Sequence, residues 1–428
     1  MKLSVASISN LEGWFKKSTG KRLPAIILGS SVNALSFARS LGRRRIPTLL
    51  LDSERLIGSY TRYGKFLMLS PAEEDSDGWL GVLELIASRL SARAVLFPTT
   101  DVHCLMVSQH RDFLHTYFRF IVPEAETMES IVNKRSQYAI ARAAGIPVPK
   151  TYFPESWEEV KHLSPDLNYP CILKPYISHT GRRELGNKKV QLVKSQAELI
   201  AAFEHLTASG QPFMIQEIIP GEDSCLHGYL AFWNKDHREL AWLTKQKLRQ
   251  NPPNYGDGSL QITVEAPEVA RLSRHLLRRF NYSGFVGVEF KFDARDSVYR
   301  LMEINPRTVS GNQLAISAGI DFPWIGYQYL TDSMPETPQA YSFRPAVKYV
   351  NEEWDIQSYF ALRRSGAINL WQWVGSLKGA KPAIGAWDDP LPLIAGVWRL
   401  LKISLRYVGS AIRRFFAGKK NRPIRVFK

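Results

Sequence analysis

The chain has little of what marks secreted, metal-clipped or membrane-spanning proteins. It contains only three cysteines among its 428 residues, none of them in a CxxC or Cys/His ligand spacing, so neither a disulfide framework nor a zinc site is indicated. The first twenty residues carry charges and no apolar run of secretory length, and no uncharged apolar stretch reaches about 18 residues. We therefore expect a reduced, cytoplasmic protein without a membrane-spanning helix.

Acidic residues are missing from the last part of the chain. Between Trp398 and Lys428 there are ten lysines and arginines and no acid, which is ten of the +16 net charge. At about 100° per residue, the basic residues of this segment gather on one side of a helix and large apolar residues on the other. Such a tail, over residues 391–428, is typical of peripheral attachment to an anionic membrane surface; packing on the protein's own core is the alternative. Nucleic acid is not an expected partner, because it would leave the apolar face uncovered.

The rest of the sequence has the composition of an ordinary folded chain. It is 45% hydrophobic and 22% charged, and its length suits about two to four domains. Apolar runs at residues 25–28 and 47–52 flank a helical pattern, and the same alternation continues to about residue 125. After a leader of residues 1–20, residues 21–125 therefore predict a small α/β domain with a parallel sheet.

Two polar turns of this domain are candidate ligand sites. Gly29-Ser30-Ser31 follows the first strand but lacks the G-x-G-x-x-G fingerprint, so a structural role is favoured over dinucleotide binding. Thr99, Thr100 and Asp101 follow a later strand, at the edge where open α/β sheets bind ligands. A substrate role for this second turn stays open.

The pattern changes near residue 126. A helix is predicted over residues 128–144, and alternating strands with hairpin-like turns dominate from there to about residue 310. This indicates an α+β domain over residues 126–335. A C-terminal extension of residues 336–390 and the basic tail would follow it.

The sharpest chemical signal is a pair of acidic strands. In residues 285–292 the period-2 rule places Glu289 on one face, and in residues 300–305 it directs Glu303 and Asn305 to one side. The opposite face of the two strands is expected to bury Val286, Val288, Phe290, Phe292, Met302 and Ile304.

A hairpin turn at residues 294–298 would set Glu289 directly across from Glu303. Like charges in that position are destabilising, so something must compensate them. Two carboxylates and an amide are oxygen ligands of the kind that Mg²⁺ prefers beside substrate phosphates. Neutralisation by Lys291 or Arg300 on a solvated sheet face is the alternative.

The residues that precede these strands resemble the ATP-grasp superfamily in their order. Lys134 lies in a helix, Lys174 ends an apolar strand, and a second apolar strand with an acid-containing hinge spans residues 213–223. The series closes with the E…E-x-N-x-R pattern that ends at Arg307. The resemblance covers about residues 21–330. It implies a small first domain followed by an ATP-grasp domain of two α+β subdomains.

The resemblance also implies roles for particular residues. It implies Mg²⁺, with Mn²⁺ as a substitute, on Glu289, Glu303 and Asn305. Arg307 would stabilise charge that develops on an acyl phosphate or tetrahedral intermediate. ATP would be held by Lys134, Lys174, Gln216, Glu217, the Ile219 backbone and, through its ribose, Asp223.

A loop of cations separates the two halves of this pattern. Lys245, Lys247 and Arg249 alternate on an extended segment and suit an acidic substrate, so Lys245 and Arg249 are candidate catalytic residues. An exposed basic edge strand is the alternative. This loop, with Tyr255 and Gly256, looks like the carboxylate–amine ligase branch that includes D-aspartate ligase.

One segment departs from the family. Residues 178–189 stand where the family has a glycine-rich loop over the phosphates, yet they contain only two glycines and four cations. The expected activity is ADP-forming: a carboxylate is activated as an acyl phosphate and joined to an amine, with an amino acid or a cell-envelope precursor among the substrates. A small-molecule kinase and a non-catalytic nucleotide-binding module at a membrane surface are the alternatives.

Overall fold

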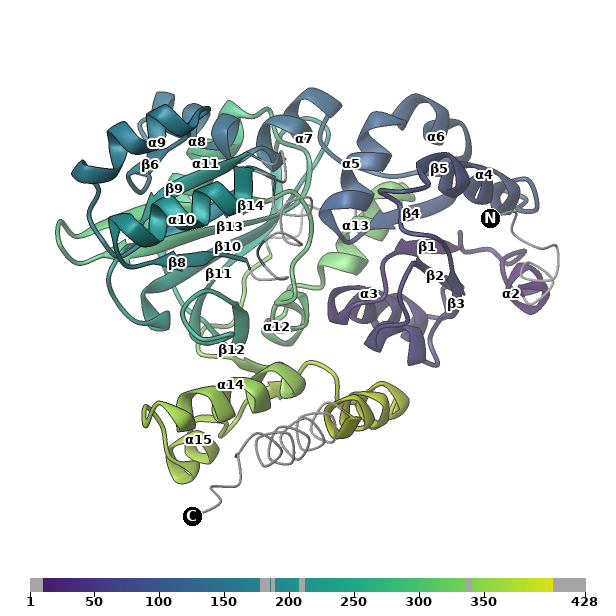
Figure 1. Cartoon of the computed structure of the whole chain (residues 1–428). Coiled ribbons are helices and arrows are strands. Elements are labelled where there is room, and N and C mark those ends of the chain that lie inside the picture. The colour runs from purple at the N-terminus through teal and green to yellow at the C-terminus, as the bar shows by residue number, and fades with distance from the viewer. Residues whose placement is uncertain (1–10, 178–184, 186–188, 208–211, 336–340, 403–428) are drawn as a thin grey trace, which may run out of the picture.

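The structure is a computed structural model that describes residues 11–177, 185, 189–207, 212–335 and 341–402 (Figure 1). Its N-terminal part is a five-stranded parallel sheet in the order β3-β2-β1-β4-β5, with helices packed against it. Every residue of β1, β2 and β4 is buried, as expected for strands covered on both faces. The predicted parallel-sheet domain is confirmed. Its elements are α2 (Glu12–Lys17), β1 (Ala25–Leu28), α3 (Val32–Arg43), β2 (Thr48–Asp52), β3 (Lys65–Met68), α4 (Ser76–Ala87), β4 (Ala94–Pro98), α5 (Asp101–Gln109), α6 (Arg111–Tyr117) and β5 (Phe118–Arg119).

The part of the expected leader that the structure describes belongs to this domain. Leu11 and Trp14 are buried in the same apolar cluster as the first-domain strands. Helix α2 is therefore packed on the domain, and the boundary drawn at residue 20 has no counterpart among the described residues.

The single helix predicted over residues 128–144 is wrong, because the chain forms two helices there. They are α7 (Ala125–Val132) and α8 (Lys134–Ala143). Asn133 between them has an extended backbone, and its side chain accepts a hydrogen bond from the Arg135 backbone N–H, which caps α8. Apolar spacing continues across the break, so periodicity alone did not reveal it. The break makes Lys134 the first residue of α8.

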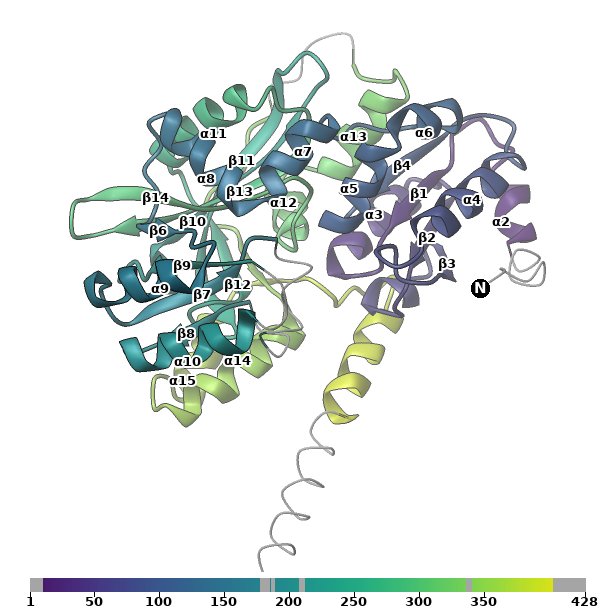
Figure 2. The ribbon, with the colours of Figure 1, turned by 45° about the horizontal axis from the view of Figure 1, so that its top comes forward.

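The second domain contains two sheets. A four-stranded antiparallel sheet has the order β6-β9-β7-β8, and a larger sheet has the order β14-β13-β10-β11-β12-β15-β16. Both carry helices, so the predicted α+β architecture is confirmed (Figures 1 and 2). The smaller sheet and its helices are β6 (Thr151–Tyr152), α9 (Trp157–Leu163), β7 (Cys171–Pro175), β8 (Gln191–Val193), α10 (Gln196–Thr207) and β9 (Phe213–Glu217). The larger unit has β10 (Leu226–Trp233), β11 (Glu239–Asn251), β12 (Asp257–Thr263), α11 (Pro267–Arg279), β13 (Gly284–Asp293), β14 (Val298–Asn305), α12 (Asn312–Ala318) and α13 (Phe322–Leu330).

The C-terminal extension continues the larger sheet. β15 (Lys348–Val350) pairs antiparallel with β12, and β16 (Lys381–Pro382) pairs parallel with β15. Helices α14 (Glu352–Arg364) and α15 (Leu370–Ser376) lie between these strands in the chain, and residues 391–402 are helical. The chain beyond residue 335 is thus joined to the second domain by strand pairing.

A buried ion pair ties this extension to the first domain. Arg39 Nε lies 2.9 Å from Asp389 Oδ2, and both side chains are at most 3% exposed. Asp389 also accepts hydrogen bonds from the Thr61 hydroxyl at 2.6 Å and the Arg62 backbone N–H at 2.9 Å. The buried carboxylate is therefore fully bonded, as a desolvated charge must be.

Asp389→Asn should lower the free energy of unfolding by about 3–5 kcal/mol, because it leaves the buried Arg39 charge uncompensated. The matched variant is Asp388→Asn, which removes an exposed pair with Arg43 and should cost less than about 1 kcal/mol. Urea unfolding followed by circular dichroism compares the two. Equal losses would contradict the structural role of Asp389.

Candidate active site

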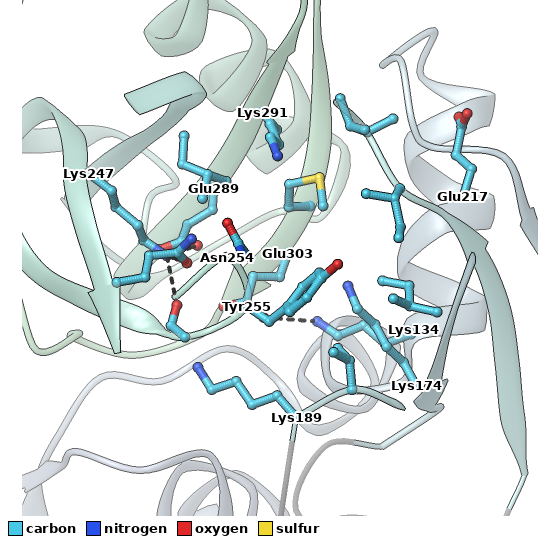
Figure 3. A pocket seen from close by; sticks show the side chains of 18 of the residues that line it. Lys134, Lys174, Lys189, Glu217, Lys247, Asn254, Tyr255, Glu289, Lys291 and Glu303 are labelled. Carbon is cyan, nitrogen blue, oxygen red and sulfur yellow. Dashed lines mark hydrogen bonds and ion pairs between the residues drawn. The ribbon is translucent and has the colours of Figure 1, made fainter. Parts of the chain in front are cut away.

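Two neighbouring cavities meet between the sheets and the first domain. One lies between the smaller and the larger sheet and is lined by residues of β7, β9, β13, β14 and the loop after β11 (Figure 3). The other lies between the first domain and the larger sheet and is lined in part by the starts of α3 and α5. We name them the inter-sheet and inter-domain cavities. The residues that line both are charged: Lys134, Lys189, Glu289 and Glu303.

Glu289 and Glu303 face each other where the two cavities meet. The antiparallel pairing of β13 with β14 sets Glu289 directly opposite Glu303, which is the register predicted from the hairpin. Lys247 Nζ lies 2.8 Å from Glu289 Oε2, and Lys134 Nζ lies 4.0 Å from Glu303 Oε2. In Figure 3, Lys247 and Glu289 lie on one side of Tyr255, and Lys134 and Lys174 on the other.

The charge compensation comes from other elements rather than from the hairpin itself. Lys291 donates to the Gly221 carbonyl at 2.8 Å, and Arg300 pairs with Asp293 at 2.7 Å, so neither alternative neutralises the carboxylate pair. Burial opposes ionisation of Glu303, but Lys134, Lys189 and its hydrogen bond from Asn305 together hold its pKa below the ordinary value. Glu303 is therefore ionised at neutral pH.

Met302 corrects the predicted burial pattern. The register shifts by one residue between Glu289 and Phe290, so that Leu301 pairs with Phe290. Leu301 is buried, as Ile304 is, whereas Met302 lines the inter-sheet cavity. A β-bulge re-aims a side chain in this way, and here it supplies an apolar wall beside the acidic pair.

Lys134 and Lys174, the predicted phosphate-binding lysines, both line the inter-sheet cavity. Burial lowers the pKa of each, that of Lys174 to about 8. Lys174 Nζ donates to Gln216 Oε1 at 2.9 Å, and the Gln216 amide donates to the hydroxyls of Tyr138 and Thr151. Gln216 is buried and does not line the cavity, so in this structure it positions Lys174.

The residues of the predicted adenine hinge also differ in whether they line the inter-sheet cavity. Glu217 and Ile219 line the inter-sheet cavity, whereas Asp223 does not. The Asp223 carboxylate accepts two hydrogen bonds from Gln250, one from the backbone N–H at 2.9 Å and one from the side chain at 2.7 Å. Gln250 itself lines the cavity. The ribose contact of Asp223 stays a prediction, and in this structure Gln250 lies between Asp223 and the cavity.

The three cations of β11 do not share one environment. Lys245 lines the inter-domain cavity and donates to Gln261 at 2.5 Å, and burial lowers its pKa to about 8. Lys247 lines the inter-sheet cavity. Arg249 forms a buried, two-pronged ion pair with Asp355 of α14, at 2.8 and 2.9 Å, and lines neither cavity.

The reason for the departure of Arg249 is a change of strand register. The pairing of β11 with β12 shifts on both sides of Arg249, so the simple alternation on which its catalytic role was predicted fails there. The structure does not bring Arg249 to the site. Lys247 lies at the site instead. It is one of the three alternating cations in the sequence, and its charge compensates that of Glu289.

Arg307 lies at the wall of the inter-domain cavity. Its Nε and Nη2 donate to the two oxygens of Asp101 at 2.8 and 3.1 Å, and Nη2 also donates to Asn305 Oδ1 at 3.2 Å. Burial lowers the pKa of Arg307, but the Asp101 carboxylate outweighs it and the pKa is raised overall. A residue of the first domain therefore orients the predicted catalytic arginine.

The predicted metal ligands fit Mg²⁺ in their chemistry. Within the described ranges no group of three His, Cys, Asp or Glu side chains could hold a metal ion by itself. Glu289, Glu303 and Asn305 are two carboxylates and an amide on one face of the hairpin, with Asn305 bonded to Glu303 at 3.0 Å. Mg²⁺ usually takes one or two carboxylates and completes its shell with water and substrate phosphates.

Several lining residues were not predicted, and one predicted segment is not described. Asn254 and Tyr255 enter the inter-sheet cavity from the loop after β11. Lys189, at 2.7 Å from Asp257, lines both cavities. In the sequence, the family resemblance pointed to Tyr255 and the excess of cations pointed to the region of Lys189. Neither signal pointed to Asn254. Most of the glycine-poor stretch at residues 178–189 lies outside the described residues.

Comparisons of the sequence with known proteins find an ATP-grasp family model and similar enzymes. A family model described as an ATP-grasp in the biosynthetic pathway with Ter operon matches residues 237–353. The D-aspartate ligase of Enterococcus faecium is 24% identical over 296 residues, which are 66% of this chain and 70% of that protein. The formate-dependent phosphoribosylglycinamide formyltransferase of Bacteroides fragilis is 31% identical over 193 residues, which are 44% of this chain and 48% of that relative, so the match spans about half of its length.

A solved structure shows the shared fold. The biotin carboxylase domain of Hydrogenobacter thermophilus 2-oxoglutarate carboxylase, in complex with MgADP, ADP and bicarbonate, matches with a TM-score of 0.59. The match is 15% identical and covers 77% of this chain and 74% of that chain. With the family model, these likenesses confirm the predicted resemblance to the ATP-grasp superfamily.

Nucleotide binding should weaken as the pH rises above about 8. Lys174 carries its charge below the pKa of about 8 that burial imposes, and loses it above. Titration calorimetry with ADP should therefore show Kd rising by up to about tenfold per pH unit in that range. Lys174→Arg keeps its charge throughout and should bind with a smaller pH dependence, the part that Lys134 contributes because burial lowers its pKa as well. The same slope in both proteins would contradict a phosphate contact of Lys174.

Proposed function

We propose that this ATP-grasp chain is an ATP-dependent carboxylate–amine ligase. The observation that carries the proposal is the meeting of two cavities at one set of charged side chains. A nucleotide in the inter-sheet cavity would bring its terminal phosphate to Lys134, Lys189, Glu289 and Glu303, which also line the inter-domain cavity. A carboxylate in the inter-domain cavity would then lie beside the phosphate that it must attack.

The reaction consists of two balanced steps. A carboxylate oxygen of the substrate attacks the γ-phosphorus of ATP, the bond to the β-phosphate oxygen breaks, and ADP leaves. The amine then attacks the acyl carbon, phosphate leaves with the C–O bond electrons, and the amine loses a proton to give the amide. The chain would contribute mainly position and charge, as is general for phosphoryl transfer.

Each residue group has a part in this scheme. Lys134 and Lys174 would bind nucleotide phosphates, and Lys245 the acidic group of a substrate. Mg²⁺ on Glu289, Glu303 and Asn305 would neutralise phosphate charge, and Mn²⁺ would suit the same ligands. Arg307, held by Asp101, would stabilise the oxyanion of the tetrahedral intermediate.

The substrate class follows from the inter-domain cavity. Lys245 is one of four cations in its lining, which also holds four carboxylates, and the turns at Ser31 and Thr100 give it hydroxyl groups. A small polar acid such as an amino acid fits this lining, and an amino acid or a cell-envelope precursor would be among the two substrates. The E. faecium relative is named a D-aspartate ligase, which agrees with an amino-acid substrate.

The location of the protein is a separate part of the proposal. No helix in the described part of the chain is long and apolar enough to cross a bilayer. We place the protein in the cytoplasm, with peripheral attachment to an anionic membrane surface through residues 391–428. Residues 403–428 of that tail lie outside the described residues.

Phosphate release should require a carboxylate and an amine together. Glu303→Gln removes one charge of the acidic pair and should lower this release by about 100-fold or more. The control is Glu268→Gln, an exposed acid on α11 that should leave the rate unchanged. Coupled ADP and phosphate assays over mixtures of acids and amines measure both rates.

Two outcomes would replace the ligase proposal. A stable phosphorylated product formed without an amine would establish the kinase alternative. ATP binding without turnover in any mixture would establish a non-catalytic nucleotide-binding module.

Asp101→Asn should lower kcat by about 10- to 100-fold, because Arg307 loses its orienting carboxylate. KM for ATP should change little, since Asp101 lines only the inter-domain cavity. Arg307→Lys should lose about as much or more, because an ammonium cannot reproduce the two-pronged contact. Asp112→Asn, an exposed acid on the same domain, is the control. An unchanged kcat in Asp101→Asn would exclude the positioning role.

A further inference from the structure

The helical residues 391–402 turn their large apolar side chains away from the protein. Leu391, Ile394, Val397, Trp398 and Leu401 are all exposed. At about 100° per residue they span roughly 120° of one helix face. Exposed apolar stripes of this kind mark an interaction surface rather than an ordinary soluble face.

The other side of the same helix is the one that contacts the protein. Pro392 and Gly396 are buried, and a Cβ at Gly396 would lie 3.6 Å from Ile57 of the first domain. Arg399 pairs with the buried Glu353 of α14 at 2.6 Å. The small and charged residues thus anchor the helix, which excludes packing of the described part of the apolar face on the protein's own core.

A second element places apolar side chains on the same side of the molecule. Leu370, Trp371 and Val374 of α15 are exposed, Trp371 to 82%, and Trp387 is fully exposed. Figures 1 and 2 both show α15 and the helix 391–402 at the lower edge of the molecule, and in Figure 1 α14 lies between them and the sheets of the second domain. We name the combined set of α15, Trp387 and residues 391–402 the C-terminal face.

Positive charges outnumber negative ones in the described part of the chain that forms this face. Between residues 370 and 402 there are four lysines and arginines, Lys378, Lys381, Arg399 and Lys402, and two acids, Asp388 and Asp389. Both acids are already paired, Asp388 with Arg43 and Asp389 with Arg39. Lys402 lies over the Trp398 ring at 5.5 Å, so a cation borders the apolar stripe directly.

We propose that the C-terminal face is a docking surface for an anionic phospholipid bilayer. Exposed tryptophans beside lysines and arginines are typical of surfaces that bind the headgroup region of a bilayer. The rings lie among the headgroups, and the cations contact the lipid phosphates. The proposal goes beyond membrane attachment by the tail, because it assigns binding to α15 and Trp387 as well. It is independent of the ligase reaction, since these residues line neither cavity.

Co-sedimentation of the full chain with vesicles tests the proposal. We expect binding to vesicles of phosphatidylcholine with phosphatidylglycerol, weaker binding to phosphatidylcholine alone, and loss of binding at high salt. Trp371→Glu and Ile394→Glu should each weaken binding by about tenfold or more, because each places a charge where apolar area would be buried. Leu85→Glu, at an exposed leucine on α4 of the first domain, should bind as the wild type does.

A second readout keeps the test independent of sedimentation. Brominated phosphatidylglycerol should quench tryptophan fluorescence in the wild type and quench less in Trp371→Phe and Trp387→Phe. Unchanged vesicle binding in both glutamate variants would overturn the proposal and leave attachment to residues 403–428. A dimer in light scattering that Trp371→Glu dissociates, without vesicle binding, would overturn it in favour of a second copy as the occupant.

Discussion

The site depends on one electrostatic constraint: two carboxylates stand opposite each other in a hairpin and must be held by positive charge. Glu289 and Glu303 meet this constraint with lysines from distant elements, Lys247 on β11 and Lys134 at the start of α8. Like charges in a cross-strand pair repel, and a partly desolvated pair repels more strongly than an exposed one. The contacts of these lysines with the pair therefore join β11 and helix α8 to the hairpin in one site.

The site also lies between domains. Of the two cavities, the described residues of the first domain line only the inter-domain one. Its Asp101 holds Arg307, and its Asn33 donates to the Thr308 carbonyl at 2.9 Å. Both contacts lie where the E-x-N-x-R segment leaves β14. Docking of the first domain and placement of Arg307 therefore depend on the same contacts, because both contacts join the first domain to the segment that places Arg307 at the inter-domain cavity.

Particular residues show how far the sequence could be read. The predicted opposition of Glu289 and Glu303 is found, but hairpin symmetry alone does not produce it. From the turn to Phe290 the strands pair one residue away from the predicted register, and the bulge at Met302 then brings Glu303 opposite Glu289. Met302 and Arg249 departed from the two-residue alternation for one reason. Each lies at a register shift, and a bulge depends on the partner strand, which no local pattern contains. Asn133 ends one helix and begins the next because its side chain caps α8, although the apolar spacing continues across it.

By itself the sequence determined the parallel first domain, the acidic hairpin, the lysines at 134 and 174, and the family order that relates them, because all of these follow from local period, spacing and residue chemistry. Only the tertiary structure decided that Asp101 orients Arg307 and that Arg249 forms an ion pair with Asp355 of α14. It also decided that Pro392 and Gly396, rather than Trp398, face the protein. These outcomes depend on which surfaces meet, and contacts between residues hundreds of positions apart are set by packing and charge pairing rather than by any pattern within one segment.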